Sequence, residues 1–125
     1  MTATYKISND ITLGKKVYNG VITVGAAGAV TSFTGEGIVS VTKETTAGQY
    51  TIKLSDINSE LTFVSLLNAG ITLSGAALDD LTFHVAADTL SSADTVKIQA
   101  HTAGTEANAT SGNKIHFTFE VACSY

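Results

Sequence analysis

The chain has 125 residues, a formal net charge of −4 at pH 7 and only 14% charged residues. This length fits one domain, and the shortage of clustered Lys and Arg argues against a nucleic-acid partner, because such a partner requires many basic side chains to neutralise its phosphates. The adjacent basic pair Lys15-Lys16 is interpreted as a solvated turn before a strand.

The single cysteine and the hydropathy of the chain further restrict the class of protein that the sequence can encode. One thiol, Cys123, cannot form an internal disulfide, so the fold has to be stable without one. No window approaches the roughly 18–20 apolar residues that span a bilayer, so no membrane partner is expected. The first residues lack a basic region followed by an apolar one, which predicts synthesis in the cytoplasm without the usual export signal.

In chain order, residues 1–13 are polar with no strong period, and we expect an extended N-terminal arm. Residues 17–24 are strand-like, but Asn19-Gly20 inside them is a hairpin signal. A bulge within one strand is the alternative, and we favour it because a hairpin would leave only a few residues on each side. Gly25-Ala26-Ala27-Gly28 is a turn of small residues.

The rest of the chain repeats short segments rich in β-branched residues, separated by turn residues. A loop with at most one helical turn is expected at 55–60, a turn at 68–70, a polar connection at 88–93 and a long loop at 101–113. Strands are predicted at 29–33, 38–42, 49–54, 61–67, 71–73, 81–86, 94–100 and 114–121. About seven to nine short strands spaced about ten residues apart predict an all-β fold. We expect a single antiparallel β-sandwich of jelly-roll or immunoglobulin-like type over residues 14–125.

Alternating residues identify the side of each strand that faces the core. A period of two places successive side chains on opposite faces of a sheet. The apolar members of three strands therefore form candidate core faces: Tyr50, Ile52 and Leu54; Val96 and Ile98; and Ile115, Phe117, Phe119 and Val121.

The residue types that carry chemistry are scattered. His84, His101 and His116 have no metal-ligand spacing, and we interpret His84 and His116 as surface residues, although two outward histidines could meet across a sheet. Asp79-Asp80 would point to opposite sides of a strand, and the triplet Asn108-Ala109-Thr110 matches a glycosylation site by chance. We therefore predict no catalytic, cofactor-binding or metal-binding residue and no enzymatic activity. Among the tyrosines, Tyr5, Tyr18 and Tyr125 are candidates for exposure.

Three stretches, in order, resemble a known group of proteins. They are the segment from Gly25 to Ser32 leading to Gly37-Ile38-Val39-Ser40-Val41, the strand entry Thr46 to Leu54, and Val96-Lys97-Ile98-Gln99 followed by Ala103-Gly104-Thr105 and Ser111 to Phe117. In this order they resemble small virion proteins of tailed bacteriophages, which include capsid decoration (cement) proteins and head-fibre proteins.

The resemblance implies a structural virion protein that binds the outside of a phage head and stabilises it. Its implied partners are the major capsid protein and further copies of the chain in a homotrimer, with the capsid surface as its location after synthesis in the host cytoplasm. The arm would make the contacts, by strand addition for example, through Thr2, Tyr5, Ile7, Ile11 and Leu13. A phage tail or fibre accessory protein and a carbohydrate-binding adhesion module are the alternatives.

Overall fold

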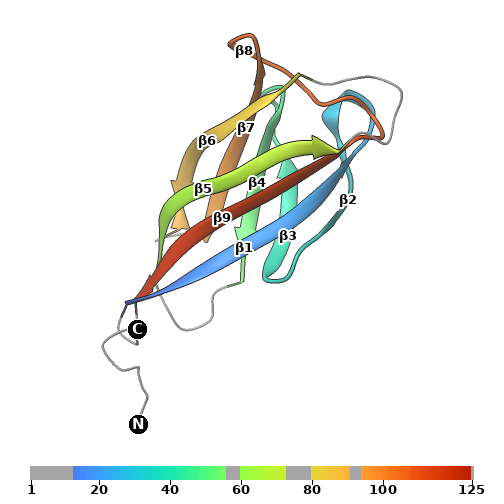
Figure 1. Ribbon diagram of the computed structural model, residues 1–125. Helices are drawn as coiled ribbons and strands as arrows, with labels where there is room; N and C mark the ends of the chain where they lie inside the picture. Colours follow the sequence, from blue (N-terminus) through green and yellow to red (C-terminus); the bar gives the residue numbers. More distant parts are fainter. Residues whose placement is uncertain (1–12, 56–59, 73–79, 91–93, 125) are drawn as a thin grey trace.

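The computed structural model describes residues 13–55, 60–72, 80–90 and 94–124 (Figure 1). Within these ranges the chain forms nine β-strands and one short 3-10 turn, which confirms the all-β prediction. The elements are β1 (Leu13–Val24), the turn at Ala26–Gly28, β2 (Val30–Thr34), β3 (Ile38–Lys43), β4 (Gln49–Leu54), β5 (Glu60–Thr72), β6 (Thr82–Thr89), β7 (Thr95–Thr102), β8 (Thr105–Glu106) and β9 (Lys114–Ser124).

The strands form two antiparallel sheets that lie one behind the other in Figure 1. The front sheet has the order β2-β1-β9-β5, and the back sheet has the order β3-β4-β7-β6, with β8 paired to β7. Burying one apolar face of each sheet against the other is the usual solution for strands that alternate apolar and polar residues. The predicted β-sandwich is therefore the observed architecture.

The core lies between the sheets and consists of the side chains that the alternation predicted. Ile115, Phe119 and Val121 of β9 are fully buried, and Phe117 is 2% exposed. Tyr50, Ile52 and Leu54 of β4 and Val96 and Ile98 of β7 are at most 1% exposed. Each large apolar side chain buried in this way stabilises the fold by about 1.5–3 kcal/mol. Leu90, in the segment predicted to be a polar connection, is 1% exposed and also belongs to this core.

The bulge predicted at Asn19-Gly20 is wrong, and so is the hairpin alternative. β1 runs through both residues, and its register with β9 is unbroken from Leu13 opposite Ser124 to Thr23 opposite Lys114. Packing explains why a glycine is present at position 20, because a Cβ at Gly20 would lie 2.6 Å from Cζ of Phe117. The same strand contains Lys15 and Lys16, which are exposed as predicted but are not in a turn.

The turn predicted at residues 68–70 is also wrong. β5 continues through these residues, and Asn68, Ala69 and Gly70 pair with successive residues of β9. The β5-β9 register shifts on either side of the segment Ser65-Leu66, and these two shifts accommodate residues of β5 that have no partner in β9. Pairing with the long central strand β9 therefore overrides a local turn signal. In the same way, the loop predicted at 101–113 contains the end of β7 and the short strand β8.

Register irregularities are confined to the outermost strands of the two sheets. The pairs that contain β2, β3, β5 and β6 each have at least one shift. The central pairs β1-β9 and β4-β7 have none. A bulge in an edge strand twists it and interrupts its free hydrogen-bonding groups, which hinders the addition of another strand. The described edges are thus poorly suited to pairing with a neighbouring sheet.

Candidate functional site

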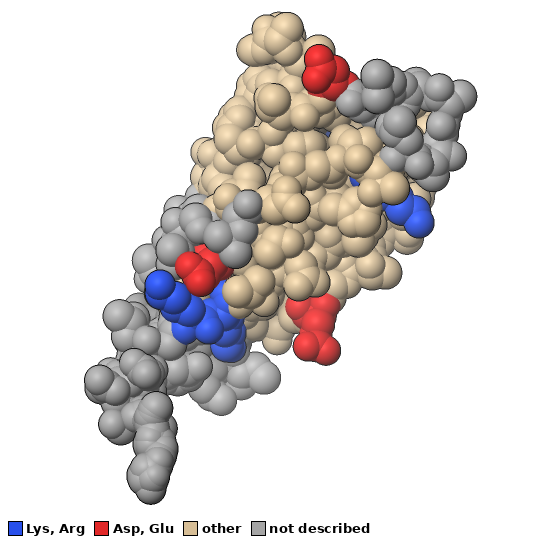
Figure 2. All heavy atoms as spheres, viewed as in Figure 1, with Lys and Arg blue, Asp and Glu red and all other residues tan. Residues whose placement is uncertain are grey.

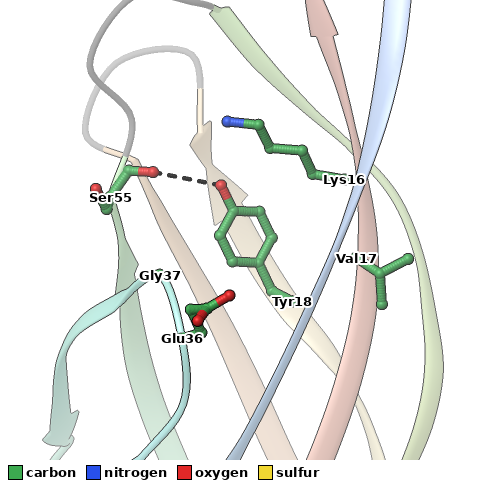
Figure 3. A pocket seen from close by; sticks show the side chains of 6 residues that line it. All are labelled: Lys16, Val17, Tyr18, Glu36, Gly37 and Ser55. Atoms are coloured by element: carbon green, nitrogen blue, oxygen red, sulfur yellow. Dashed lines mark hydrogen bonds between the residues drawn. The ribbon is translucent and has the colours of Figure 1, made fainter.

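An open hollow of about 350 Å³ lies at the end of the sandwich where β1 begins (Figure 3). Three segments that are distant in the sequence form it: the start of β1, the β2-β3 turn and the residue after β4. The residues that line it are Lys16, Val17, Tyr18, Glu36, Gly37 and Ser55.

Tyr18 forms the inner wall of this hollow. Its ring stacks on Phe119 with a centroid distance of 5.8 Å, and its hydroxyl donates a hydrogen bond to the Ser55 carbonyl at 3.3 Å. The side chain is only 5% exposed, so the expectation that Tyr18 could be exposed is wrong. Residues an even number of positions apart in a strand lie on the same face. Tyr18 is four residues before the buried Ile22, so it faces the core as well.

Gly37 allows the β2-β3 turn to lie directly against the tyrosine ring. Its φ is +81°, and a Cβ there would lie 2.8 Å from Cε2 of Tyr18. The Gly37 carbonyl accepts a hydrogen bond from the Ser55 amide at 2.8 Å, which ties the turn to the end of β4. A residue with a side chain at position 37 would be both strained and sterically obstructed. The shape of the hollow thus depends on this glycine.

The outer part of the hollow carries opposite charges. Lys16 extends along one side of the Tyr18 ring and Glu36 lies on the other, whereas Val17 points away on the opposite side of β1 (Figure 3). Lys16 and Glu36 are both exposed, and Val17 is 55% exposed. The end of the molecule where β1 begins also gathers lysine side chains in Figure 2, and most of the described surface in that view is uncharged. The hollow can therefore contact a polar partner through one cation, one carboxylate and adjoining apolar surface.

Of the predicted interface residues, only Leu13 is in the part of the chain that the structure describes. Thr2, Tyr5, Ile7 and Ile11 are outside the described residues. Leu13 opens β1 and pairs with Ser124, so the segment 1–12 joins the sandwich three residues before Lys16 of the hollow. Sequence reasoning did not assign Glu36, Gly37 or Ser55 to a site. The sequence signal at this place is a carboxylate between two glycines at 35–37, and this pattern by itself indicates only a turn.

The structure shows which histidines meet across a sheet, a question that the sequence left open. His84 and His116 are exposed, as predicted, but they are on different sheets. His84 of β6 instead meets His101 of β7, with ring centroids 4.4 Å apart and ring planes inclined by 19°. This pairing follows from the β6-β7 register, which places Thr82 opposite His101 and is invisible in the sequence. In the described ranges, no group of three or more His, Cys, Asp and Glu side chains is positioned to hold a metal ion.

Asn108, the first residue of the glycosylation triplet, has a structural contact. Its Oδ1 accepts a hydrogen bond from the Gly48 amide at 2.7 Å, and it lies against Gly28, where a Cβ would be 2.6 Å from the same oxygen. The side chain therefore joins three loops at the end of the sandwich opposite the hollow: the 3-10 turn, the β3-β4 turn and the segment between β8 and β9.

Comparisons with models of known protein families, with characterised proteins and with solved structures found no match. In the portion of the chain that the structure describes, no helix has both the length and the apolar character needed to cross a bilayer.

Proposed function

We propose that this chain is a structural virion protein, a capsid decoration protein that binds the outside of a phage head and stabilises it. The proposal rests first on the resemblance of residues 20–121 to small phage virion proteins. A packed sandwich with a low proportion of charged residues, 14% against about a quarter in ordinary domains, supports it as a rigid body suited to crowding on a lattice.

The observation that supports the proposal is that Leu13, where the segment 1–12 joins the sheet, is in the strand that lines the hollow three residues later. The β1-β9 register pairs Leu13 with Ser124 at the end of the front sheet where β1 begins. The bulged edges disfavour assembly through the described edge strands, which leaves the ends and faces of the sandwich for contacts. In this proposal the segment 1–12 and the hollow form one attachment surface for the major capsid protein.

Oligomerisation belongs to the same proposal. Decoration of a symmetric lattice multiplies weak contacts, because each copy that binds holds its linked neighbours at high effective concentration. We propose a homotrimer in solution and on the capsid. Size-exclusion chromatography with light scattering tests this directly, and a monomer at every concentration together with no capsid affinity would exclude the assignment.

The binding test uses the full chain and purified phage heads that lack this protein. Co-sedimentation should retain the wild-type chain with the heads, and electron microscopy should show added density on the outer capsid surface. Density confined to the tail would contradict the head assignment. Glycan binding by the free protein that is lost in Tyr5→Ala, without head binding, would replace the proposal with an adhesion module.

Matched variants separate the attachment surface from general charge effects. Lys16→Glu, at the hollow, should weaken head binding at least tenfold. Lys114→Glu makes the same change at the other end of the front sheet, where Lys114 is exposed and pairs with Thr23. This control should bind like the wild type. Equal effects of both variants would show that overall charge, and not the hollow, governs binding. Ile7→Ser tests the arm in the same assay, and unchanged binding would remove it from the surface.

A further inference from the structure

We propose that the stacked pair His84–His101 makes the outermost strand of the back sheet sensitive to acid, so that protonation of both imidazoles separates β6 from β7. Free histidine side chains take up a proton near about pH 6.5, which places such a change within the physiological range. Neither histidine lines the hollow, so this contact is separate from the attachment surface proposed above.

The pair links β6 to β7 diagonally. His84 is opposite Gln99, and Thr82, two residues earlier in β6, is opposite His101. Diagonal neighbours on one face of a sheet are within reach of aromatic and long side chains. Here the ring centroids are 4.4 Å apart and the ring planes are inclined by 19°. Among the described strands β6 pairs with β7 alone, so the two rings lie across the pairing that holds β6 in the sheet.

The stacked arrangement is compatible with one positive charge but not with two. When one imidazole is protonated, its charge faces a neutral ring. When both are protonated, two like charges are held face to face at 4.4 Å, and like charges on neighbouring strands are destabilising. Separation of the strands relieves this repulsion, so the separated form binds more protons than the paired form. The pairing therefore becomes less favourable as the pH falls.

A buried nitrogen is a second and independent observation. The Nδ1 atom of His101 is shielded from solvent and has no hydrogen-bond partner among the described residues. In a protonated imidazole both ring nitrogens are donors. Protonation of His101 in the paired form therefore leaves a buried, charged donor without an acceptor, which costs more than an unpaired neutral group.

The charged neighbours do not remove the repulsion between the rings. Glu106 of β8 is opposite His101, and Asp80 precedes β6; both carboxylates are on exposed residues. Glu106 offsets at most one of the two positive charges. Lys97 of β7 is on the same face as His101 and adds positive charge, and β4 contributes the uncharged Gln49 to this part of the face. The rings are closer together than the screening length of about 8 Å at physiological salt, so their repulsion persists there.

Separation of β6 has a structural consequence. Phe83 and Val85 alternate with His84 along β6 and pack against the core. Their release uncovers apolar surface, and it leaves β7 with an unpaired edge. Exposed apolar patches and unpaired strand edges both favour contacts with other chains. Acid would thus change the surface that this side of the sandwich presents.

Hydrogen exchange of the full chain at pH 7.5 and pH 5.5, corrected for the intrinsic effect of pH on exchange, tests the proposal. In the wild type we expect the protection of β6 amides and of their β7 partners to fall at least fivefold at pH 5.5, while β1 and β9 keep theirs. His84→Phe retains a ring that does not titrate and should abolish the fall. His116→Phe is the matched control, because His116 is an exposed histidine on the other sheet, and it should behave like the wild type.

Folding of each variant is checked at pH 7.5, where the protection of β1 and β9 should equal that of the wild type. If the larger ring in His84→Phe disturbs β6 at that pH, His84→Gln and His101→Gln provide the same comparison without a second ring. Protection of β6 that is independent of pH in the wild type would overturn the proposal. An equal fall in the His84 variants, or a fall spread evenly over both sheets, would overturn it as well.

Discussion

Gly20 of β1 lies directly opposite Phe117 of β9, and a Cβ atom on Gly20 would come within 2.6 Å of Cζ of that ring. The phenylalanine ring therefore occupies the space of the missing side chain. This contact between the two central strands of the front sheet explains why a glycine is present in the middle of a twelve-residue strand, where it would otherwise weaken the strand.

Gly20→Ala should lower the free energy of unfolding by about 1–3 kcal/mol, because the added methyl group overpacks the core against Phe117 and the Thr34 carbonyl. Gly70→Ala is the matched control. Gly70 pairs with β9 from the other side, and nothing lies within 4 Å of a Cβ there. Urea unfolding measures both variants. A stability loss as large for Gly70→Ala as for Gly20→Ala would show that the contact with Phe117 does not explain the effect.

Tyr50→Phe should cost about 1–2 kcal/mol at pH 7. The Tyr50 hydroxyl is buried and donates to the Gly28 carbonyl at 2.5 Å, so its removal leaves a buried acceptor unsatisfied. Chemical denaturation provides the measurement. A variant as stable as the wild type would indicate that solvent or another donor satisfies the carbonyl.

The same tyrosine predicts how stability depends on alkaline pH. Burial raises the pKa of Tyr50 from 10.0 to about 12. Because the folded-state pKa lies above the unfolded-state value, the contribution of this group is complete below pH 10 and is lost as the pH rises towards 12. Within that window the loss approaches about 1.4 kcal/mol per pH unit. The stability difference between wild type and Tyr50→Phe should therefore shrink between pH 10 and pH 12, and a constant difference would refute the assignment.

Asn108→Ala should lower the free energy of unfolding by about 1–2 kcal/mol, because the Gly48 amide loses its acceptor. Asn108→Asp retains an oxygen at the same position and should recover most of the loss. Differential scanning calorimetry at pH 7 compares the two variants. If the Asp and Ala variants are destabilised equally, the acceptor oxygen at this position does not account for the loss.

The prediction of the fold succeeded where the apolar rhythm was strongest. In β9, the four apolar side chains that the alternation assigned to the core are the ones that are buried. The prediction is wrong at Asn19-Gly20 and at residues 68–70, where the local sequence indicates a turn but the chain stays extended. Both segments pair with β9 over long sequence distances, and that pairing keeps them extended.

The candidate sites were less accessible to sequence reasoning. The hollow combines Tyr18, Glu36 and Ser55, which come from three separate elements. His84 and His101 are seventeen positions apart and meet only because of the β6-β7 register. Neither grouping has a characteristic spacing, because contacts between strands are set by the order and register of the sheet.

By itself, the sequence determined that the chain is all-β and which side chains face the core, since a strand exposes alternate residues to opposite sides. The tertiary structure alone decided which strands are neighbours, that the edges are bulged, and that Tyr18 is buried beneath a glycine turn. The physical reason is that alternation is a local property of the backbone, whereas register and packing depend on residues far apart in the chain.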